Sequence, residues 1–309
     1  MTTDDEKQPL TTIAQLVAAS DDSMRNNHSA ESEKNLQNVA VHNKSPEAVN
    51  LTHVKNDGLA AEVNGKKSVA IMDRLLAGDM LVPGSNIGRE IQDDYRRIKR
   101  PLVSNACGRN KALLKRGNII LVTSSIPGEG KTYSSTNLAL SISREVDSTV
   151  LLVDCDVARH GVSRLLGING LPGLVDVLEN DTLHIGDVIL QTDVPNLRVV
   201  SAGKQHEDVT ELLASQRMSN LVDELANRYS DRIVIFDGPP MLPTPQTQIL
   251  AGLVGQVVFI IEVGKTPQAM VEDALKLIPE DQATGLVLNK NEGLSVKGYY
   301  YGYYGPDDA

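Results

Sequence analysis

Cysteine is scarce in this 309-residue chain. Its two cysteines, Cys107 and Cys155, form no CxxC pair, and its six histidines show no ligand spacing. A disulfide framework needs paired cysteines in an oxidising compartment, and a structural zinc site needs clustered ligands. The composition therefore predicts free thiols in a reducing compartment and argues against a disulfide-rich or zinc-bound fold.

Positive charge and long apolar runs are also in short supply. Lys and Arg total 30 against 40 Asp and Glu, so the formal net charge is -10. Non-specific binding to DNA needs an excess of basic residues, so we expect no nucleic-acid partner. The longest apolar run, 249–261, is interrupted by Gly252, Gly255 and Gln256 and is too short to span a bilayer. Because the first ten residues also lack the features of a signal peptide, we expect a cytoplasmic protein.

The N-terminal part of the chain divides into two regions. Residues 1–68 are rich in Ser, Asn, Asp, Glu and Lys, which predicts a mostly disordered polar region. Residues 69–115 carry apolar side chains at helical spacing, first up to Pro83-Gly84 and then from about Ser85 onward. We interpret residues 69–115 as a helical extension.

A glycine-rich stretch, NIILVTSSIPGEGKT, occupies residues 118–132. Its apolar run predicts a buried parallel strand, and its glycines let the backbone curl with N–H groups facing inward. The following helix begins at a Lys-Thr pair and presents an anion-binding N-terminus. In such a loop the lysine reaches the β- and γ-phosphates and the threonine ligates Mg²⁺, although Ser125 replaces the usual first glycine. The predicted nucleotide-binding residues are Gly128, Glu129, Gly130, Lys131, Thr132 and Tyr133.

Three aspartates follow two further apolar runs. Residues 149–153 lead into Asp154 and Asp156, and residues 233–236 lead into Asp237. Carboxylates at the C-terminal ends of parallel strands face the ligand crevice, and the i, i+2 spacing puts the first two on one face. We therefore expect all three to converge with the phosphate loop on a single catalytic site.

Further apolar runs near 257–263 and 286–288 alternate with helical stretches. Such alternation predicts βαβ units, so residues 116–290 should form an α/β P-loop domain with a doubly wound, mostly parallel sheet and helices on both faces. The chain then ends in a Gly/Tyr-rich segment, 291–309, which holds five of its eight tyrosines. Interspersed glycines argue against a core strand, so we predict a flexible tail with accessible phenols. The candidate phospho-acceptors are Tyr299, Tyr300, Tyr301, Tyr303 and Tyr304.

Phosphoryl transfer asks little covalent chemistry of a protein beyond positioning and charge stabilisation. A tyrosine hydroxyl, with a pKa near 10, is protonated at neutral pH, so a carboxylate beside the γ-phosphate would accept its proton during attack. Asp154 or Asp156 could do this for a phenol or, in a hydrolase, for water. The tyrosine cluster favours a phenol over water as the attacking group.

These motifs together resemble a known family. The stretches SSIPGEGKT, LLVDCD and IVIFDGPP and the tyrosine-rich end are similar to the bacterial tyrosine kinases over about residues 88–305. The stretches YRRIKRPL, TELLAS and YGYYG are similar to the subgroup of tyrosine autokinases associated with exosortase and exopolysaccharide loci. The resemblance implies an ATP- and Mg²⁺-dependent kinase that phosphorylates its own tail and governs capsule or exopolysaccharide chain length and export.

The resemblance also assigns roles to the site residues. Lys131 and Thr132 take the phosphate and Mg²⁺ roles. Asp154 is the implied base, and Asp156 and Asp237 are the carboxylates that hold Mg²⁺ directly or through water.

Contacts with other molecules follow from the same resemblance. The family's ExxRxxR pattern, which joins subunits into a ring, corresponds to Asp93, Arg96 and Lys99, with conservative changes of both the Glu and the last Arg. Asn289, just after the last predicted strand, is a candidate for contact with adenine. Members act with a membrane-spanning polysaccharide co-polymerase, which we expect to be a separate protein that holds the kinase at the inner face of the plasma membrane.

Two further departures from the family pattern keep other functions open. Ala158 stands where Arg is usual, with Arg159 next, and Gly238 replaces a hydroxyl residue. A non-catalytic ATP-binding adaptor is therefore one alternative. The other is a partner-switching ATPase of the ParA and MinD type, but that class carries a second lysine where this chain has Ile126 and does not explain the clustered tyrosines.

Overall fold

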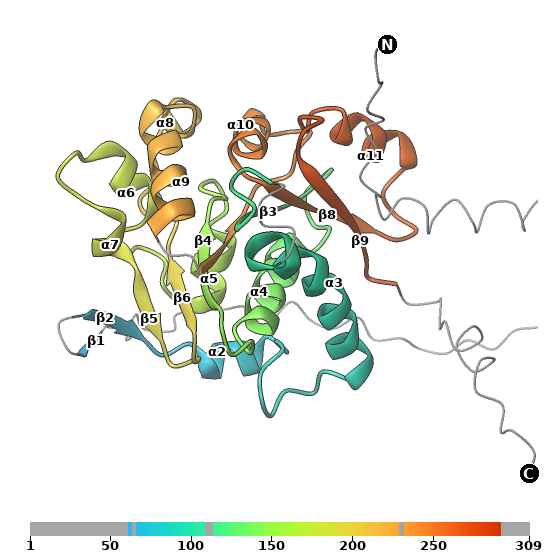
Figure 1. The fold of residues 1–309 in the computed structure, drawn as a ribbon, viewed down its shortest axis with the longest axis horizontal. Helices are drawn as coiled ribbons and strands as arrows, with labels where there is room; N and C mark the ends of the chain where they lie inside the picture. The colour runs from blue at the N-terminus through green and yellow to red at the C-terminus, as the bar shows by residue number, and fades with distance from the viewer. Residues whose placement is uncertain (1–60, 64–65, 109–113, 229–231, 292–309) are drawn as a thin grey trace, which may run out of the picture. The chain divides into compact units, whose positions relative to one another are not determined.

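A computed structural model describes residues 61–63, 66–108, 114–228 and 232–291. Within them the strands form one nine-stranded sheet in the order β1-β2-β5-β6-β4-β7-β3-β8-β9 (Figure 1). The strands are β1 (Ala61–Val63), β2 (Lys66–Val69), β3 (Ile119–Ser124), β4 (Thr149–Asp154), β5 (Leu190–Thr192), β6 (Leu197–Val200), β7 (Arg232–Asp237), β8 (Gln256–Glu262) and β9 (Ala283–Asn289).

The centre of the sheet is parallel. The neighbouring strands β4, β7, β3, β8 and β9 all run in the same direction, and β6 is parallel to β4 on its other side. The pairs β1–β2 and β5–β6 are antiparallel. In the register, Asp237 lies opposite Asp154 on one neighbouring strand and opposite Val122 on the other. The carboxyl ends of β4, β7 and β3 therefore meet at one edge, where the phosphate loop begins.

Helices cover both faces of the sheet. They are α2 (Met72–Ala77), α3 (Arg89–Cys107), α4 (Lys131–Ile142), α5 (Gly161–Leu166), α6 (Leu174–Glu179), α7 (Ile185–Val188), α8 (Val209–Leu213), α9 (Gln216–Arg228), α10 (Pro245–Leu253) and α11 (Gln268–Leu275). Alternate residues of β3 point to opposite faces of the sheet. Ile120 and Val122 pack in the hydrophobic cluster that includes α2 to α5, and Ile119 and Leu121 pack in the cluster that includes α6 to α11. This pattern follows from the two-residue period of a strand, and it confirms the predicted doubly wound α/β fold.

The N-terminal boundary differs from the sequence-based prediction. Strands β1 and β2 lie at the end of the region, 1–68, that we expected to be disordered, and the first helix is shortened to α2 because β2 takes residues up to Val69. The stretches AEV and KKSV are too short and polar to show strand periodicity. Their structure is decided by pairing, of β2 with β5 and of β1 with β2. Residues 1–60 and the tyrosine cluster lie outside the described residues. No helix that the structure describes is long and apolar enough to cross a membrane.

Candidate nucleotide site

The loop between β3 and α4 has the shape expected of a phosphate cradle. Gly128 and Gly130 adopt φ angles of 93° and 97°, a left-handed conformation that glycine adopts without steric cost. The Lys131 side chain is 7% exposed, and its Nζ donates a hydrogen bond to Ser124 Oγ at 3.1 Å. Burial lowers the pKa of Lys131, and the nearby carboxylates of Asp237 and Asp156 oppose that shift.

Asp237 connects the end of β7 to the first turn of α4. Its Oδ2 accepts a hydrogen bond from Thr132 Oγ1 at 2.8 Å, and its Oδ1 accepts one from Ser135 Oγ at 2.9 Å. The carboxylate is fully buried, and burial followed by the charge of Asp154 raises its pKa to about 7. Ser135 belongs to none of the sequence motifs, but its position three residues after Thr132 places both hydroxyls on one face of the helix.

The two carboxylates of the middle motif have different surroundings. Asp154 is fully buried: its Oδ2 accepts bonds from the backbone N and Oγ of Ser163 at 2.8 and 2.7 Å, and its Oδ1 accepts the backbone N of Asp156 at 3.2 Å. Burial raises the pKa of Asp154 to about 6. Asp156 accepts the backbone N of Arg159 at 3.2 Å and lines an open cavity. Of the two, only Asp156 lines that cavity.

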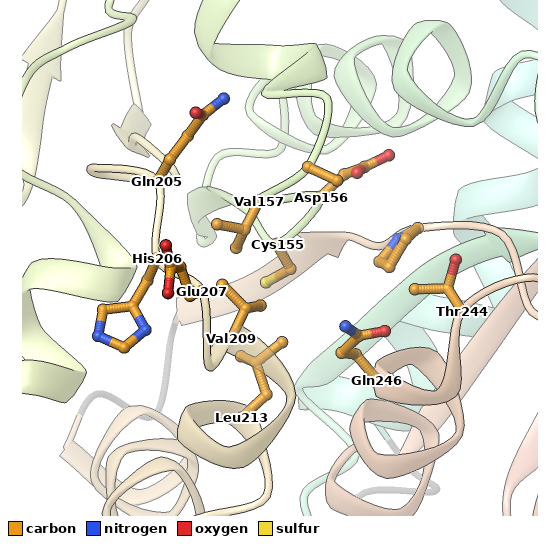
Figure 2. Close-up of a pocket in the computed structure, with 12 residues that line it drawn as sticks. Cys155, Asp156, Val157, Gln205, His206, Glu207, Val209, Leu213, Thr244 and Gln246 are labelled. Atoms are coloured by element: carbon orange, nitrogen blue, oxygen red, sulfur yellow. The ribbon is translucent and has the colours of Figure 1, made fainter.

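The cavity beside Asp156 has a volume of about 490 Å³. Figure 2 shows Asp156 and Thr244 at one side of it, His206 and Gln205 at the other, and Val209 and Leu213 of α8 below. Gln246 Nε2 donates to Thr210 Oγ1 at 2.6 Å, while its buried Oε1 has no hydrogen-bond partner in the described chain. The cavity thus combines apolar walls with a carboxylate.

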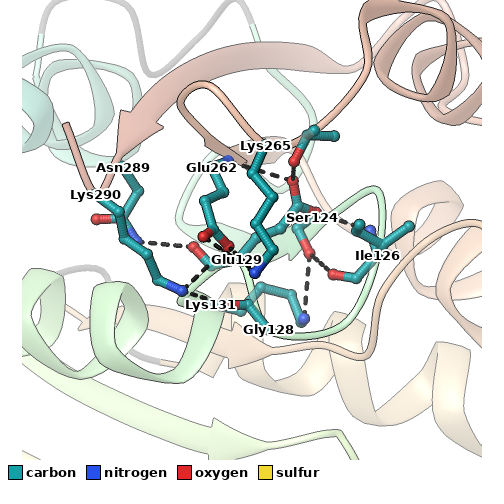
Figure 3. A network of polar contacts seen from close by, with 10 residues as sticks. Ser124, Ile126, Gly128, Glu129, Lys131, Glu262, Lys265, Asn289 and Lys290 are labelled. Carbon is teal, nitrogen blue, oxygen red and sulfur yellow. Dashed lines mark hydrogen bonds and ion pairs between the residues drawn. The ribbon is translucent and has the colours of Figure 1, made fainter. Parts of the chain in front are cut away.

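The outer side of the loop is held by residues from the end of the sheet. Asn289 Nδ2 donates to the carbonyl oxygen of Glu129 at 2.8 Å, and Lys290 Nζ donates to that of Gly128 at 2.7 Å (Figure 3). Asn289 therefore lies against the loop, and its contact with adenine stays a prediction. The side chain of Tyr133 points away from the loop, because its hydroxyl donates to the carbonyl oxygen of Asp79 at 3.2 Å.

The three predicted oligomer-contact residues lie on α3 but differ in exposure. Asp93 and Arg96 form an exposed ion pair with each other. The Lys99 side chain is only 12% exposed, pairs with Glu145 and donates to the carbonyl oxygen of Ser141 at 2.8 Å. Lys99 is thus engaged within its own chain, and the predicted ring contact at these three positions stays a prediction.

The donors present fit a nucleotide-bound Mg²⁺ ion. Among the residues that the structure describes, no group of three or more His, Cys, Asp and Glu side chains is placed to hold a metal ion by itself. Mg²⁺ in nucleotide sites, however, is held by one or two protein oxygens together with substrate phosphates and water. The Thr132 hydroxyl and the Asp237 carboxylate are adjacent oxygens of this kind.

These features define a P-loop nucleotide-binding domain. A buried lysine and a threonine lie at the N-terminus of α4, after a glycine loop and next to aspartates at the ends of strands. The family model described as "AAA domain" matches residues 117–275, just over half of the chain. The chain is 31% identical over 198 residues to the tyrosine-protein kinase CpsD of Streptococcus agalactiae, covering 63% of this chain and 84% of the relative. It belongs to the bacterial tyrosine kinase family.

Two further matches show how much of each relative is shared. The tyrosine-protein kinase ptk of Acinetobacter johnsonii is 32% identical over 176 residues, which are 56% of this chain but only 24% of the relative. The chain therefore spans about a quarter of that longer protein. The crystal structure of the VpsO kinase domain superposes with a TM-score of 0.55 at 28% identity and covers 65% of this chain and 96% of that domain.

Proposed function

We propose that this protein is an ATP- and Mg²⁺-dependent protein-tyrosine autokinase that phosphorylates its own C-terminal tyrosine cluster. The observation that carries the proposal is the grouping of Lys131, Thr132 and Asp237 at one P-loop, with Asp156 beside an open cavity. The names of the relatives, tyrosine-protein kinases, support the same chemistry.

The residues of the loop would act mainly by positioning and charge. The Lys131 ammonium would lie against the β- and γ-phosphates, where it stabilises the negative charge of the transition state. The Thr132 hydroxyl and Asp237 would hold Mg²⁺, with Asp156 as a further ligand directly or through water, and the ion would neutralise phosphate charge.

The acceptor phenol needs a base and space to approach. The cavity supplies apolar walls at Val209 and Leu213, and Asp156 lines it as a carboxylate that could accept the phenolic proton. Asp154 remains the base that the family pattern implies, but its oxygens already accept bonds from Ser163 and from the backbone of Asp156. Asp154→Asn separates the two assignments, because full phosphotyrosine formation in this variant would exclude Asp154 as the base. Asp156→Asn does not, because Asp156 is also proposed to contact Mg²⁺.

We also propose the cellular setting that the family suggests. The kinase would regulate the chain length and export of an exopolysaccharide or capsule from the inner face of the plasma membrane. A membrane-spanning polysaccharide co-polymerase would be its activator, and ring-like homo-oligomers would present each tail to a neighbouring site.

A phosphotyrosine assay on the full chain with Mg²⁺-ATP tests the activity. Lys131→Met and a form truncated after Lys297 should both lose the signal, whereas Lys276→Met, an exposed lysine paired with Asp273 on α11, should keep it. ATP binding without phosphotyrosine would support the adaptor instead. Steady phosphate release without phosphotyrosine would support the partner-switching ATPase.

A further inference from the structure

The carbonyl oxygens of the phosphate loop are held from outside. Lys290 Nζ lies 2.7 Å from the Gly128 oxygen, and Asn289 Nδ2 lies 2.8 Å from the Glu129 oxygen (Figure 3). Both donors come from the end of β9, more than a hundred and fifty residues away in the sequence. The two contacts therefore join the last strand of the sheet to two consecutive peptide groups of the loop.

Each of these two peptide groups adjoins a glycine, which makes its reversal easier. A peptide flip rotates ψ of one residue and φ of the next, and it meets least resistance where one of the two is glycine. Gly128 precedes the first peptide and Gly130 follows the second, and both are in the left-handed region. A flip of either peptide would replace an inward N–H group with a carbonyl oxygen, which repels phosphate.

The side chain of Glu129 fixes the loop at a third point. Its Oε2 accepts the backbone N of Ile126 at 2.7 Å, and its Oε1 accepts Thr266 Oγ1 at 2.5 Å and the backbone N of Glu262 at 3.3 Å. This carboxylate is fully buried. Because hydrogen bonds hold both the main chain and the side chain of Glu129, its carbonyl oxygen stays in reach of Asn289.

Lys290 is itself positioned for this contact. It has a φ of 57°, which non-glycine residues rarely adopt unless their surroundings impose it. Its Nζ also pairs with Glu262 Oε2 at 3.1 Å, which keeps the ammonium beside the loop.

We propose that Asn289 and Lys290 are positioning residues that keep the N–H groups of Glu129 and Gly130 directed at the nucleotide phosphates. They would act through the loop backbone, so they would affect binding of the polyphosphate independently of the base that it carries. This inference rests on the nucleotide-binding half of the proposed function and is independent of tyrosine transfer.

Titration calorimetry on the full chain tests the proposal with Mg²⁺-ATP, Mg²⁺-GTP and Mg²⁺-tripolyphosphate. Asn289→Ala and Lys290→Ala should each weaken binding of all three about tenfold, because each loses one hydrogen bond that holds the cradle. Lys290→Arg, which keeps the cation and its donors, should restore most of the affinity. Lys265→Ala is the matched control, because Lys265 pairs with Glu262 at 3.2 Å and, in the described chain, its hydrogen bonds go to Glu262.

The outcomes separate this inference from its rivals. Loss confined to ATP, with tripolyphosphate binding unchanged, would overturn it and favour the adenine contact of Asn289. Unchanged affinities in both variants would also overturn it while leaving the kinase assignment intact. A wild-type protein that binds all three ligands but makes no phosphotyrosine would contradict the proposed function alone.

Discussion

Thr132 Oγ1 donates a hydrogen bond to Asp237 Oδ2 over 2.8 Å, so the two oxygens proposed to hold Mg²⁺ are hydrogen-bonded directly to each other. Metal binding must break or redirect this hydrogen bond, because both oxygens have to turn their lone pairs toward the ion. Thr132→Val, which keeps the shape and removes the hydroxyl, should lower kinase activity at least about tenfold. Thr132→Ser should retain most activity. Phosphotyrosine formation measured over a range of Mg²⁺ concentrations distinguishes them, and equal activity of Val and Ser would refute the ligand role.

The buried Asp237 makes stability depend on pH. Its pKa rises from 3.8 to about 7 on folding, so Asp237 binds a proton more tightly in the folded state than in the unfolded state. Its protonation therefore stabilises the fold at low pH, and this contribution to the free energy of unfolding is lost as pH rises through about 7. Asp237→Asn removes the titration. Without Mg²⁺ or nucleotide, the variant should gain stability relative to the wild type between pH 5 and pH 8. Urea denaturation at the two pH values measures this, and a difference independent of pH would contradict it.

The cavity beside Asp156 should be needed for the acceptor but not for ATP. Val209→Trp places an indole in the space lined by Val209 and Leu213, so phosphotyrosine formation should fall about tenfold or more while Mg²⁺-ATP affinity stays unchanged. Val146→Trp, at a side chain 92% exposed, is the control for tryptophan itself. Full kinase activity in the Val209 variant would mean that the phenol approaches elsewhere.

The α3 residues should separate assembly from folding. Arg96→Glu changes an exposed side chain, so it should leave the unfolding transition nearly unchanged and reduce oligomers in mass photometry. Lys99→Glu should instead lower the melting temperature by several degrees, because it places a carboxylate beside Glu145 and removes the bond to the carbonyl oxygen of Ser141. If both variants assemble as the wild type does, α3 is not the subunit contact.

The central fold was predictable because it rests on local signals. Continuous apolar runs at 119–122, 149–153 and 233–236 became β3, β4 and β7, which are buried on both faces. Strands β5 and β6 gave no such signal, since Leu190–Thr192 is three residues long and gains its structure from neighbours. β1 and β2 were missed for the same reason.

The residues that form the site were more predictable than the contacts that they make with one another. Motif spacing brought Lys131, Thr132 and Asp237 together, as the structure places them. No sequence pattern could show that Ser163 binds Asp154 or that Lys290 reaches Gly128, because those contacts join separate elements. The subgroup associated with exosortase loci also stays a prediction.

The strand pair β1–β2 has a practical consequence for anyone shortening the protein. β2 covers the edge of β5, and both β1 and β2 lie before residue 117, where the family match begins. A version cut to the matched region would bare the backbone donors and acceptors of β5, and uncovered strand edges promote aggregation. Recombinant work on the kinase domain should therefore start before Ala61, even though the recognisable motifs begin far later.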